Sequence, residues 1–308
     1  MKTSYDTTAF AKINLFLRCC GKYPNGYHRL YMLMQQIGIG DDILVELDDE
    51  REYVIELESG VDIPRENDLG YKAAKAFYDC YTDKLRAEAK PVPKFPYTFI
   101  RETKKVPSQA GLGGGSSDAA AVLQILQQHF GNPLTDEDMN ATAAKLGADV
   151  PFFLFGGTCI CEGVGEIVTE LPGLSGVNII LVKPEAGVGT KECYELSDEN
   201  PALFDEYAYR EQMNAVFTDE KKLPVERIAQ AAPFLVNDLQ EPAVHLAPVI
   251  AELIDAVKNT GAVFSAMTGS GSCVFGIYED EKSAGEAEAA LQNDPRTSGC
   301  QIIPSVLI

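Results

Sequence analysis

A glycine-rich segment, VPSQAGLGGGSSDAAAV at residues 106–122, offers the clearest chemistry in the chain. Glycine has no Cβ, so its backbone can approach a ligand closely and present several N–H groups to an anion. The residues that follow predict a helix beginning at Ser116, Ser117 and Asp118, and a helix N-terminus carries about half a positive charge. The segment is therefore expected to hold the phosphates of a nucleotide triphosphate, with Ser116 or Ser117 as a candidate Mg²⁺ ligand.

Three other interpretations of this segment compete with a triphosphate cradle. A Walker A loop requires Gly-x4-Gly-Lys-Ser/Thr, but the Gly-Lys pair of this chain is Gly21–Lys22, followed by Tyr23. A dinucleotide-binding loop requires a third glycine where this chain has Ser116. A flexible turn that binds nothing is the third alternative.

Two charged residues stand in unusually apolar stretches. Lys12 interrupts AFAKINLFL, in which alternation of residues such as Ile13 and Leu15 predicts a strand. Asp149 lies in GADVPFFLF, where burying a carboxylate alone would be unfavourable. A Lys12–Asp149 ion pair would account for both and would keep Asp149 ionised. The alternatives are a lysine that reaches solvent from an edge strand and an aspartate in a turn before Val150.

The composition narrows the class of protein. The chain has 308 residues, with 46 Asp and Glu against 26 Lys and Arg, and a formal net charge of −20. Such a charge repels nucleic acid and anionic membranes, so we expect small molecules as partners and neither of those. The eight cysteines form no Cys-x-x-Cys pair and there are three histidines, which predicts reduced thiols, a cytoplasmic protein and no structural zinc. The N-terminal residues lack the long apolar core of a signal peptide, and no segment is apolar enough for a membrane span.

Hydrophobic periodicity and turn residues predict the elements of the first half. Strands are expected at 9–20, 31–37, 42–47 and 97–106, a turn at 24–26, and a helix at 68–87. The helix after the glycine segment should end by Gly131, and a second should run from Thr135, capped by Asp138, to near Gly147. Residues 147–166 are expected to form an apolar strand region broken by glycines.

The second half of the sequence has a different pattern of predicted elements. Strands are expected at 177–184, 262–267, 272–278 and 300–307, with helices at 242–258 and 282–292 and a polar, mobile stretch up to about residue 225. The order strand, helix, strand, strand, helix, strand is that of a split βαβ unit. We therefore expect two domains, at residues 1–165 and 166–308.

Three motifs stand in a characteristic order along the chain: AKINLFL at 11–17, AGLGGGSSDAAA at 110–121 and MTGSGSCVFG at 267–276. Together they resemble the three motifs of the GHMP kinase superfamily, named for galactokinase, homoserine kinase, mevalonate kinase and phosphomevalonate kinase. The resemblance implies an α+β GHMP kinase fold, with an N-terminal ribosomal-S5-like domain and a C-terminal ferredoxin-like domain. It implies ATP as co-substrate, with Mg²⁺. Phe10 departs from the proline usual before Ala11.

Further motifs, NGYHRL at 25–30, LGADVPFFL at 146–154 and EGVGE at 162–166, resemble superfamily members that phosphorylate the 2-hydroxyl of a cytidine-diphosphate-linked methylerythritol. The resemblance makes Asp149 the base and Lys12 its partner. It implies these substrate contacts: Asn14, Tyr27, His28, Thr190 and Tyr194. It implies these ATP contacts: Lys104, Pro107, Gly111, Leu112, Gly113, Gly114, Gly115, Ser116 and Ser117. It places the third glycine motif, behind the phosphate loop, at Thr268, Gly269, Ser270 and Gly271.

Simpler interpretations of these residues remain open. Tyr27 could be a packing tyrosine beside a turn, and Lys104 a solvated charge beside Lys105. The function could also be that of another GHMP kinase with a different small-molecule substrate, or of a nucleotide-binding sensor without catalysis.

Overall fold

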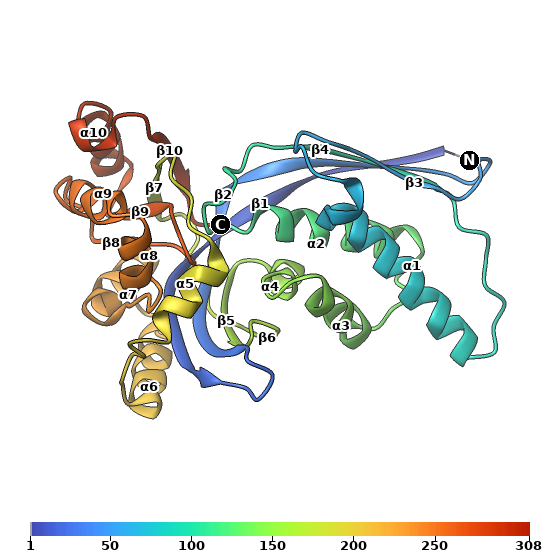
Figure 1. The fold of residues 1–308 in the computed structure, drawn as a ribbon, viewed down its shortest axis with the longest axis horizontal. Coiled ribbons are helices and arrows are strands. Elements are labelled where there is room, and N and C mark those ends of the chain that lie inside the picture. Colours follow the sequence, from blue (N-terminus) through green and yellow to red (C-terminus); the bar gives the residue numbers. More distant parts are fainter. Residues whose placement is uncertain (1) are drawn as a thin grey trace. The chain divides into compact units, whose positions relative to one another are not determined.

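The computed structural model describes residues 2–308, which divide into two compact units (Figure 1). The first unit contains residues 2–11, 39–106 and 113–155, and the second contains residues 12–38, 107–112 and 156–308. Each unit is thus assembled from several segments of the chain, whereas the predicted domains are two continuous segments that meet between residues 165 and 166. The predicted domain boundary between residues 165 and 166 therefore stays a prediction.

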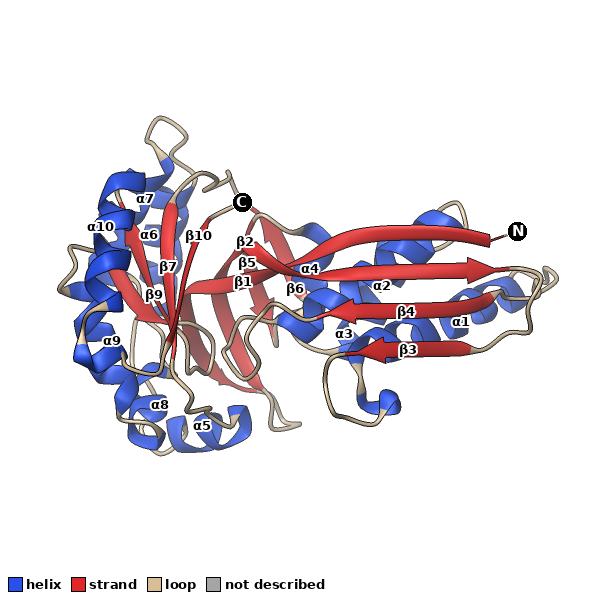
Figure 2. Cartoon of the chain, turned by 90° about the horizontal axis from the view of Figure 1, so that it is seen from above, coloured by secondary structure: helices blue, strands red, loops and turns tan. Residues whose placement is uncertain are grey.

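The first unit is a sheet with helices on one face. Its part of β2 (His28–Asp48) pairs antiparallel with β4 (Tyr97–Thr103), and β4 pairs parallel with β3 (Ile55–Ser59). The strand β1 (Lys2–Lys22) pairs with β2, and both long strands contribute residues to both units. Figures 1 and 2 show the helices of this unit gathered on one face of the sheet. They are α1 (Leu69–Ala87), α2 (Gly114–His129), α3 (Asp136–Leu146) and α4 (Val150–Phe155), with the 3₁₀ turn η1 (Arg65–Asn67) before α1.

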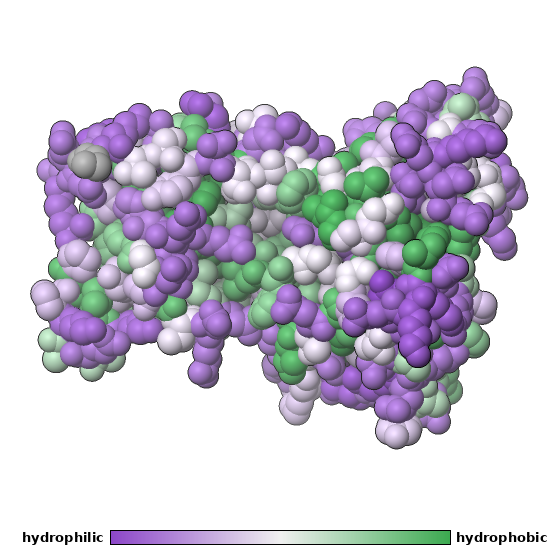
Figure 3. Space-filling view, turned by 180° about the vertical axis from the view of Figure 1, so that it is seen from behind, coloured by the Kyte–Doolittle hydropathy of each residue, from purple (hydrophilic) through white to green (hydrophobic). Residues whose placement is uncertain are grey.

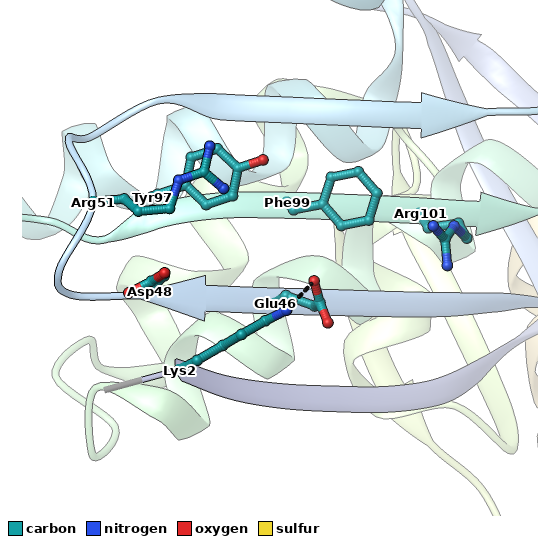
Figure 4. Close-up of a pocket in the computed structure, with 7 residues that line it drawn as sticks. All are labelled: Lys2, Glu46, Asp48, Arg51, Tyr97, Phe99 and Arg101. Atoms are coloured by element: carbon teal, nitrogen blue, oxygen red, sulfur yellow. Dashed lines mark ion pairs between the residues drawn. The ribbon is translucent and has the colours of Figure 1, made fainter.

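Alternation along β4 separates the two faces of this sheet. Thr98, Ile100 and Glu102 are buried, and Thr98 bonds to Tyr78 of α1, so these residues face the helices. The residues between them line a shallow hollow of about 280 Å³ on the opposite face (Figure 4). Its lining is Lys2, Glu46, Asp48, Arg51, Tyr97, Phe99 and Arg101. None of the predicted site residues lines this hollow.

The second unit contains two sets of paired strands. The first part of β2 pairs antiparallel with β5 (Thr158–Gly163), which pairs with β6 (Ile167–Glu170). A separate antiparallel sheet has the order β10-β7-β9-β8. Its strands are β7 (Asn178–Lys183), β8 (Phe264–Met267), β9 (Val274–Tyr278) and β10 (Gln301–Val306).

The helices of the second unit complete the predicted split βαβ pattern. They are α5 (Thr190–Ser197), α6 (Glu206–Phe217), α7 (Pro224–Ala231), α8 (Gln240–Leu246), α9 (Val249–Lys258) and α10 (Glu281–Gln292), with 3₁₀ turns η2 (Ala232–Phe234) and η3 (Pro295–Thr297). Both α9 and α10 pack on the sheet that contains β7 and β9. The four buried residues Ile179–Val182 of β7 lie in the core of this layer.

Several predicted elements are confirmed. The helix expected at 68–87 is α1, whose first turn is capped by Asp68 through bonds from the Gly70 and Tyr71 amides. The helix expected from Thr135 is α3, and Thr135 and Asp138 form the predicted reciprocal cap. The hairpin, the helix and the closing strand predicted after residue 262 are also present as β8, β9, α10 and β10.

Other predictions are wrong for identifiable reasons. Residues 150–155 form the helix α4 rather than a strand, because a short apolar run does not by itself distinguish the two. The stretch expected to be mobile contains α5, α6 and the start of α7. The helix expected at 242–258 is interrupted at Ala247 and Pro248 into α8 and α9, and β3 was not predicted.

The two strands expected at 31–37 and 42–47 are one continuous strand, β2. Gly38 and Gly40 lie between the two predicted strands, and neither has a positive φ angle, so the backbone stays extended through both. Gly40 instead allows a close approach to β1, since a Cβ there would lie 2.6 Å from the Ala9 carbonyl oxygen and 2.7 Å from Thr8 Cγ2. Gly40 is therefore required for packing, and the strand passes through it.

The surface is mainly polar on the face that Figure 3 draws. Figure 3 shows hydrophilic residues over most of the visible face, interrupted by smaller apolar areas. Across residues 2–308, none of the helices combines the length and the apolar character needed to span a bilayer.

The contact at Gly40 generates a stability prediction. Gly40→Ala should lower the free energy of unfolding by roughly 1–3 kcal/mol, because the added methyl group overlaps the Ala9 backbone. Urea unfolding, followed by circular dichroism, measures the change. Gly285→Ala in α10 is the matched control, since its added Cβ would meet nothing within 4 Å beyond its neighbours in the chain and the backbone of its own helix. Equal urea midpoints for the Gly40 variant and the wild type would show that this close approach does not constrain the strand.

Candidate active site

The N-terminus of α2 presents the backbone groups expected of a phosphate cradle. This helix begins at Gly114, two residues earlier than predicted, and its N-cap is Gly113 in the left-handed conformation with φ of 73°. The first N–H groups of a helix have no partner within it, and a glycine N-cap has no side chain to satisfy them. Backbone donors at residues 114–116 are thus free of helical acceptors and suited to an anion.

The two candidate serines differ in their surroundings. Ser117 is buried, and its hydroxyl donates to the Gly114 carbonyl at 2.7 Å and to the Ala9 carbonyl at 3.3 Å. Ser116 is half-buried. Since the Ser117 hydroxyl is engaged with the backbone, Ser116 is the better candidate for a phosphate or Mg²⁺ contact.

In the second unit, the loop 107–112 packs directly on the third glycine motif. Gly111 has a φ of 73°, and a Cβ there would lie 2.2 Å from the Thr268 carbonyl oxygen. Gly269 faces the same point, where an added Cβ would lie 3.1 Å from Gly111 Cα. These glycines permit two backbones to touch, so within the second unit Gly111 of the first glycine segment lies against Thr268 and Gly269 of the third motif.

The strand β1 is tied to the same place. The Lys12 amide donates to the Leu112 carbonyl at 3.0 Å, and the Asn14 amide donates to Thr268 Oγ1 at 2.9 Å. The Lys12 ammonium donates to Asn14 Oδ1 at 2.6 Å. Both side chains are almost fully buried, with exposed fractions of 3% for Lys12 and 1% for Asn14. The polar pair is therefore held in a fixed position relative to Leu112 and Thr268.

A residue that the sequence analysis missed supports the third motif from behind. Asn237 donates through Nδ2 to the carbonyls of Met267, at 2.9 Å, and Gly269, at 2.8 Å. The residues around it run beside β1, where Leu17 exchanges backbone bonds with Val236 and Asp238. No motif marks Asn237, because its partners lie some thirty residues later in the chain.

Asp149 lies in the first unit, in the turn immediately before α4. It is half-buried, whereas Val150, Pro151 and Phe152 behind it are buried. The carboxylate is thus less enclosed than its apolar sequence context indicated. Because Lys12 belongs to the second unit, the Lys12–Asp149 pair stays a prediction.

The residues predicted to bind cytidine lie in the second unit, and two of them are in contact. The rings of His28 and Tyr194 have centroids 4.6 Å apart and planes inclined by 30°. Tyr27, after the turn at Gly26, is 64% exposed. Thr190, at the start of α5, exchanges a hydrogen bond of 2.9 Å with Ser270 of the third glycine motif.

A cavity of about 350 Å³ adjoins His28. It is lined by Cys19, Gly21, Lys22, His28, Ser197, Asp198, Asn200, Pro201, Ala202 and Asp238. Asp198 accepts a bond from His28 Nε2 at 2.8 Å through one oxygen and pairs with Lys22 through the other. The cavity therefore has a polar wall beside the predicted cytidine contacts.

Lys104 is engaged with two buried carboxylates of the first unit. Its ammonium lies 2.5 Å from Asp41 Oδ2 and also pairs with Asp118 Oδ2. Burial raises the pKa of Asp118 to about 7, although Lys104 opposes that rise. Burial lowers the pKa of Lys104, but the attraction of Asp118 and Asp41 outweighs it and raises the pKa, so Lys104 stays charged. Any contact between Lys104 and ATP would have to be shared with these carboxylates.

Glu102 extends this acidic cluster. Its side chain is buried, and Ser59 donates to Oε2 at 3.1 Å. Burial, followed by repulsion from Asp118 and Asp68, raises the pKa of Glu102 to about 8. Asp41 and Glu102 were not singled out from the sequence, since neither stands in a recognisable motif.

Comparison with known families identifies sequence domains that agree with this arrangement. Residues 69–157 match the GHMP kinases N terminal domain, and residues 221–296 match the GHMP kinases C terminal domain. The first match includes the glycine segment and Asp149, and the second includes Asn237 and the third glycine motif.

Curated relatives match over nearly the whole chain. A 4-diphosphocytidyl-2-C-methyl-D-erythritol kinase of Desulfitobacterium hafniense is 38% identical over 285 residues, which is 92% of this chain and 90% of the relative. A protein of the same name from Clostridium botulinum is 34% identical over 283 residues, covering 89% of this chain and 91% of the relative.

Solved structures confirm the expected α+β GHMP kinase fold. A crystal structure of 4-(cytidine 5'-diphospho)-2C-methyl-D-erythritol kinase aligns with a TM-score of 0.72 and 29% identity, over 98% of this chain and 99% of that one. A homoserine kinase from Cytophaga hutchinsonii also aligns with a TM-score of 0.72, at 19% identity, over 100% of this chain and 95% of that one. The second likeness concerns the fold alone.

The exposed start of α2 generates a binding prediction. A Cβ at Gly115 would make only an ordinary contact, 3.5 Å from Leu69 Cδ1, so Gly115→Val should fold normally. The branched side chain would obstruct close approach of a triphosphate to the backbone donors. We expect ATP affinity to fall by about tenfold or more, equivalent to about 1.4 kcal/mol. Titration calorimetry with Mg–ATP measures this, with Gly285→Val as control. Unchanged affinity in a folded Gly115 variant would exclude the α2 N-terminus from the ATP site.

The raised pKa of Glu102 generates a pH prediction. In the folded protein this carboxyl keeps its proton to about pH 8, whereas an ordinary glutamate loses it near 4.5. Between these values unfolding releases a proton, so the free energy of unfolding falls as the pH rises, by up to about 1.4 kcal/mol per pH unit. Glu102→Gln should flatten that dependence. Urea unfolding from pH 5 to pH 8 is the measurement.

The matched control for this experiment is Glu286→Gln, on the exposed surface of α10. It should retain the wild-type dependence of stability on pH. If the Glu102 and Glu286 variants give parallel curves, Glu102 does not retain its proton in the folded protein.

Proposed function

Because this chain belongs to the 4-diphosphocytidyl-2-C-methyl-D-erythritol kinase family of the GHMP kinases, we propose that it transfers the γ-phosphate of ATP to the 2-hydroxyl of 4-diphosphocytidyl-2-C-methyl-D-erythritol. The observation that carries this proposal is the 38% identity to a relative of that name over 92% of the chain. The reaction would serve the non-mevalonate synthesis of isoprenoid precursors. The thiol state of the cysteines fits an enzyme of the cytoplasm, acting on small molecules.

GHMP kinases use ATP as co-substrate, and the backbone donors at the start of α2 are suited to its phosphates. Bound Mg²⁺ would neutralise charge on the phosphate oxygens. Within residues 2–308 no cluster of three acidic, cysteine or histidine side chains is arranged to hold a metal. A cation brought with the nucleotide, and contacted by the Ser116 hydroxyl, fits this donor set better than one held by the protein alone.

We assign the proton transfer to Asp149. Its carboxylate would accept the proton of the substrate 2-hydroxyl as that oxygen forms a bond to the γ-phosphorus, and the bond from phosphorus to the ADP oxygen breaks. Lys12 would keep Asp149 ionised and orient the hydroxyl. The bond from the Lys12 ammonium to Asn14 supports this role, because it fixes the direction of the ammonium.

The cytidine end would be held by aromatic residues. Tyr27 and Tyr194 would stack on the two faces of cytosine, and the His28 main chain would bond to the edge of the base. The contact between the His28 and Tyr194 rings supports a shared site, as does the bond from Thr190 to the third glycine motif.

Phosphoryl transfer with defined substrates tests the proposal. The purified chain is incubated with Mg–ATP and either 4-diphosphocytidyl-2-C-methyl-D-erythritol, mevalonate or homoserine, and the product is followed by ³¹P NMR. We expect a new phosphate monoester only with the cytidine substrate. Preference for mevalonate or homoserine would indicate another GHMP kinase, and ATP binding without transfer to any acceptor would indicate a sensor.

The assignment of Asp149 and Lys12 gives a kinetic prediction. Asp149→Asn keeps the shape of the side chain but removes the base, so the single-turnover rate should fall by at least about 10²–10⁴-fold while ATP affinity is retained. Lys12→Met should cause a similar loss. If the two residues act as one unit, the double variant should lose little more than either single variant.

Rapid-quench measurement with both substrates saturating separates the alternatives. A folded Asp149→Asn protein with a near-normal rate would rule out the base assignment. A double variant that shows the full product of the single losses would mean that the two residues act independently.

A further inference from the structure

The side chain of Asp198 links the turn between β1 and β2 to α5. Lys22 ends β1, His28 begins β2, and Asp198 is the C-cap of α5. Asp198 Oδ1 lies 2.8 Å from His28 Nε2, and the other oxygen pairs with the Lys22 ammonium. One carboxylate thus joins both ends of the turn that carries Tyr27.

A second connection closes the arrangement. The Asp198 amide donates to the Tyr194 carbonyl at 3.2 Å, and the Tyr194 ring contacts the His28 ring. The His28 side chain is only 13% exposed, although the turn before it is exposed. His28, Tyr194 and Asp198 therefore restrain one another through a side-chain bond, a ring contact and a backbone bond.

The charge of Asp198 suits this role. Burial raises its pKa, but the bonds from Lys22 and His28 outweigh burial and lower the pKa overall. The carboxylate is therefore ionised at neutral pH and accepts charge-assisted bonds from both partners.

From this geometry we infer that Asp198 is a positioning residue for the cytidine end of the substrate. This inference rests on the proposed function, and it adds a residue that contacts neither the base nor the reacting atoms. Asp198 binds the His28 side chain, and the His28 ring contacts the Tyr194 ring, so Asp198 restrains the orientation of both residues around the position proposed for the pyrimidine. Without that link, the substrate would have to order the turn on binding, which lowers affinity.

The expected effect is confined to one substrate. A hydrogen bond contributes about 0.5–1.5 kcal/mol net. The Asp198 side chain is 33% exposed, so solvent screening reduces the electrostatic attraction between Asp198 and His28. Asp198→Ala should therefore raise the KM for the cytidine substrate by about 3- to 10-fold. The KM for ATP and kcat should stay near the wild-type values, because neither the phosphate loop nor the base is altered.

Matched variants separate positioning from general damage. Asp198→Asn keeps an acceptor oxygen for His28 but loses the charge, so its KM should lie between the wild-type and Asp198→Ala values. Glu199→Gln removes a carboxylate at the next, exposed position and should leave every constant unchanged. Urea unfolding of each variant verifies that the fold is intact.

Binding of cytidine 5′-diphosphate provides a readout that is independent of turnover. The chain has three histidines, so the ring-proton signals of His28 can be assigned by NMR through substitution. In the wild type these signals should be displaced by the Tyr194 ring and should move when the nucleotide is added. In Asp198→Ala they should move toward unstructured positions, and the dissociation constant should rise by the same factor as KM.

The outcomes are distinguishable. Wild-type affinity and an unmoved His28 signal in folded Asp198→Ala would overturn the inference, as would failure of the wild type to bind the nucleotide. Nucleotide binding that weakens in Asp198→Ala, without phosphoryl transfer by the wild type, would support the inference but contradict the proposed reaction.

Discussion

The contact of Gly111 with the backbone of Thr268 is the constraint on which the second unit's part of the site depends. A Cβ at Gly111 would lie 2.2 Å from the Thr268 carbonyl oxygen, so no side chain can separate the two segments. This contact fixes the loop 107–112 against the turn 268–271, and β1 joins both through Leu112 and Thr268. The positions of Lys12 and Asn14 follow from a backbone approach that only glycine permits.

That constraint also explains why residues far apart in the sequence are needed together. The turn at 268–271 is held on its other side by Asn237, whose side-chain amide donates to the carbonyls of Met267 and Gly269. Asn237 is itself placed by strand-like pairing of its neighbours with Leu17. The third glycine motif is thus positioned by β1 twice, once through Asn14 and once through Asn237.

Local signals predicted most of the fold, and tertiary packing accounts for the failures. The cap formed by Thr135 and Asp138 involves neighbouring residues, so sequence alone revealed it. The helix α6 could have been found, because its buried residues Tyr209, Met213, Val216 and Phe217 follow helical spacing. The continuation of β2 through Gly40 could not be predicted from the sequence, since it depends on the close contact of Gly40 with the Ala9 backbone of β1. Among the proposed site residues, motif resemblance supplied Lys12, Asn14 and His28, whereas Asp198 and Asn237 are recognised only through side-chain partners more than 25 residues away.

Because the chain is strongly acidic, backbone N–H groups are important for binding anionic substrates at the proposed site. The proposed substrates are both anionic, yet the chain carries a net charge of −20. Two of the lysines near the predicted contacts are already neutralised, Lys104 by Asp41 and Asp118 and Lys22 by Asp198. Their charge therefore contributes little to attracting a polyphosphate at a distance. The backbone N–H groups at the start of α2 contribute the positive end of the helix dipole, which does not depend on a lysine side chain. The proposed phosphate site would therefore depend on glycines that expose the backbone, while the carboxylates beside Lys22 and Lys104 hold those ammonium groups in ion pairs.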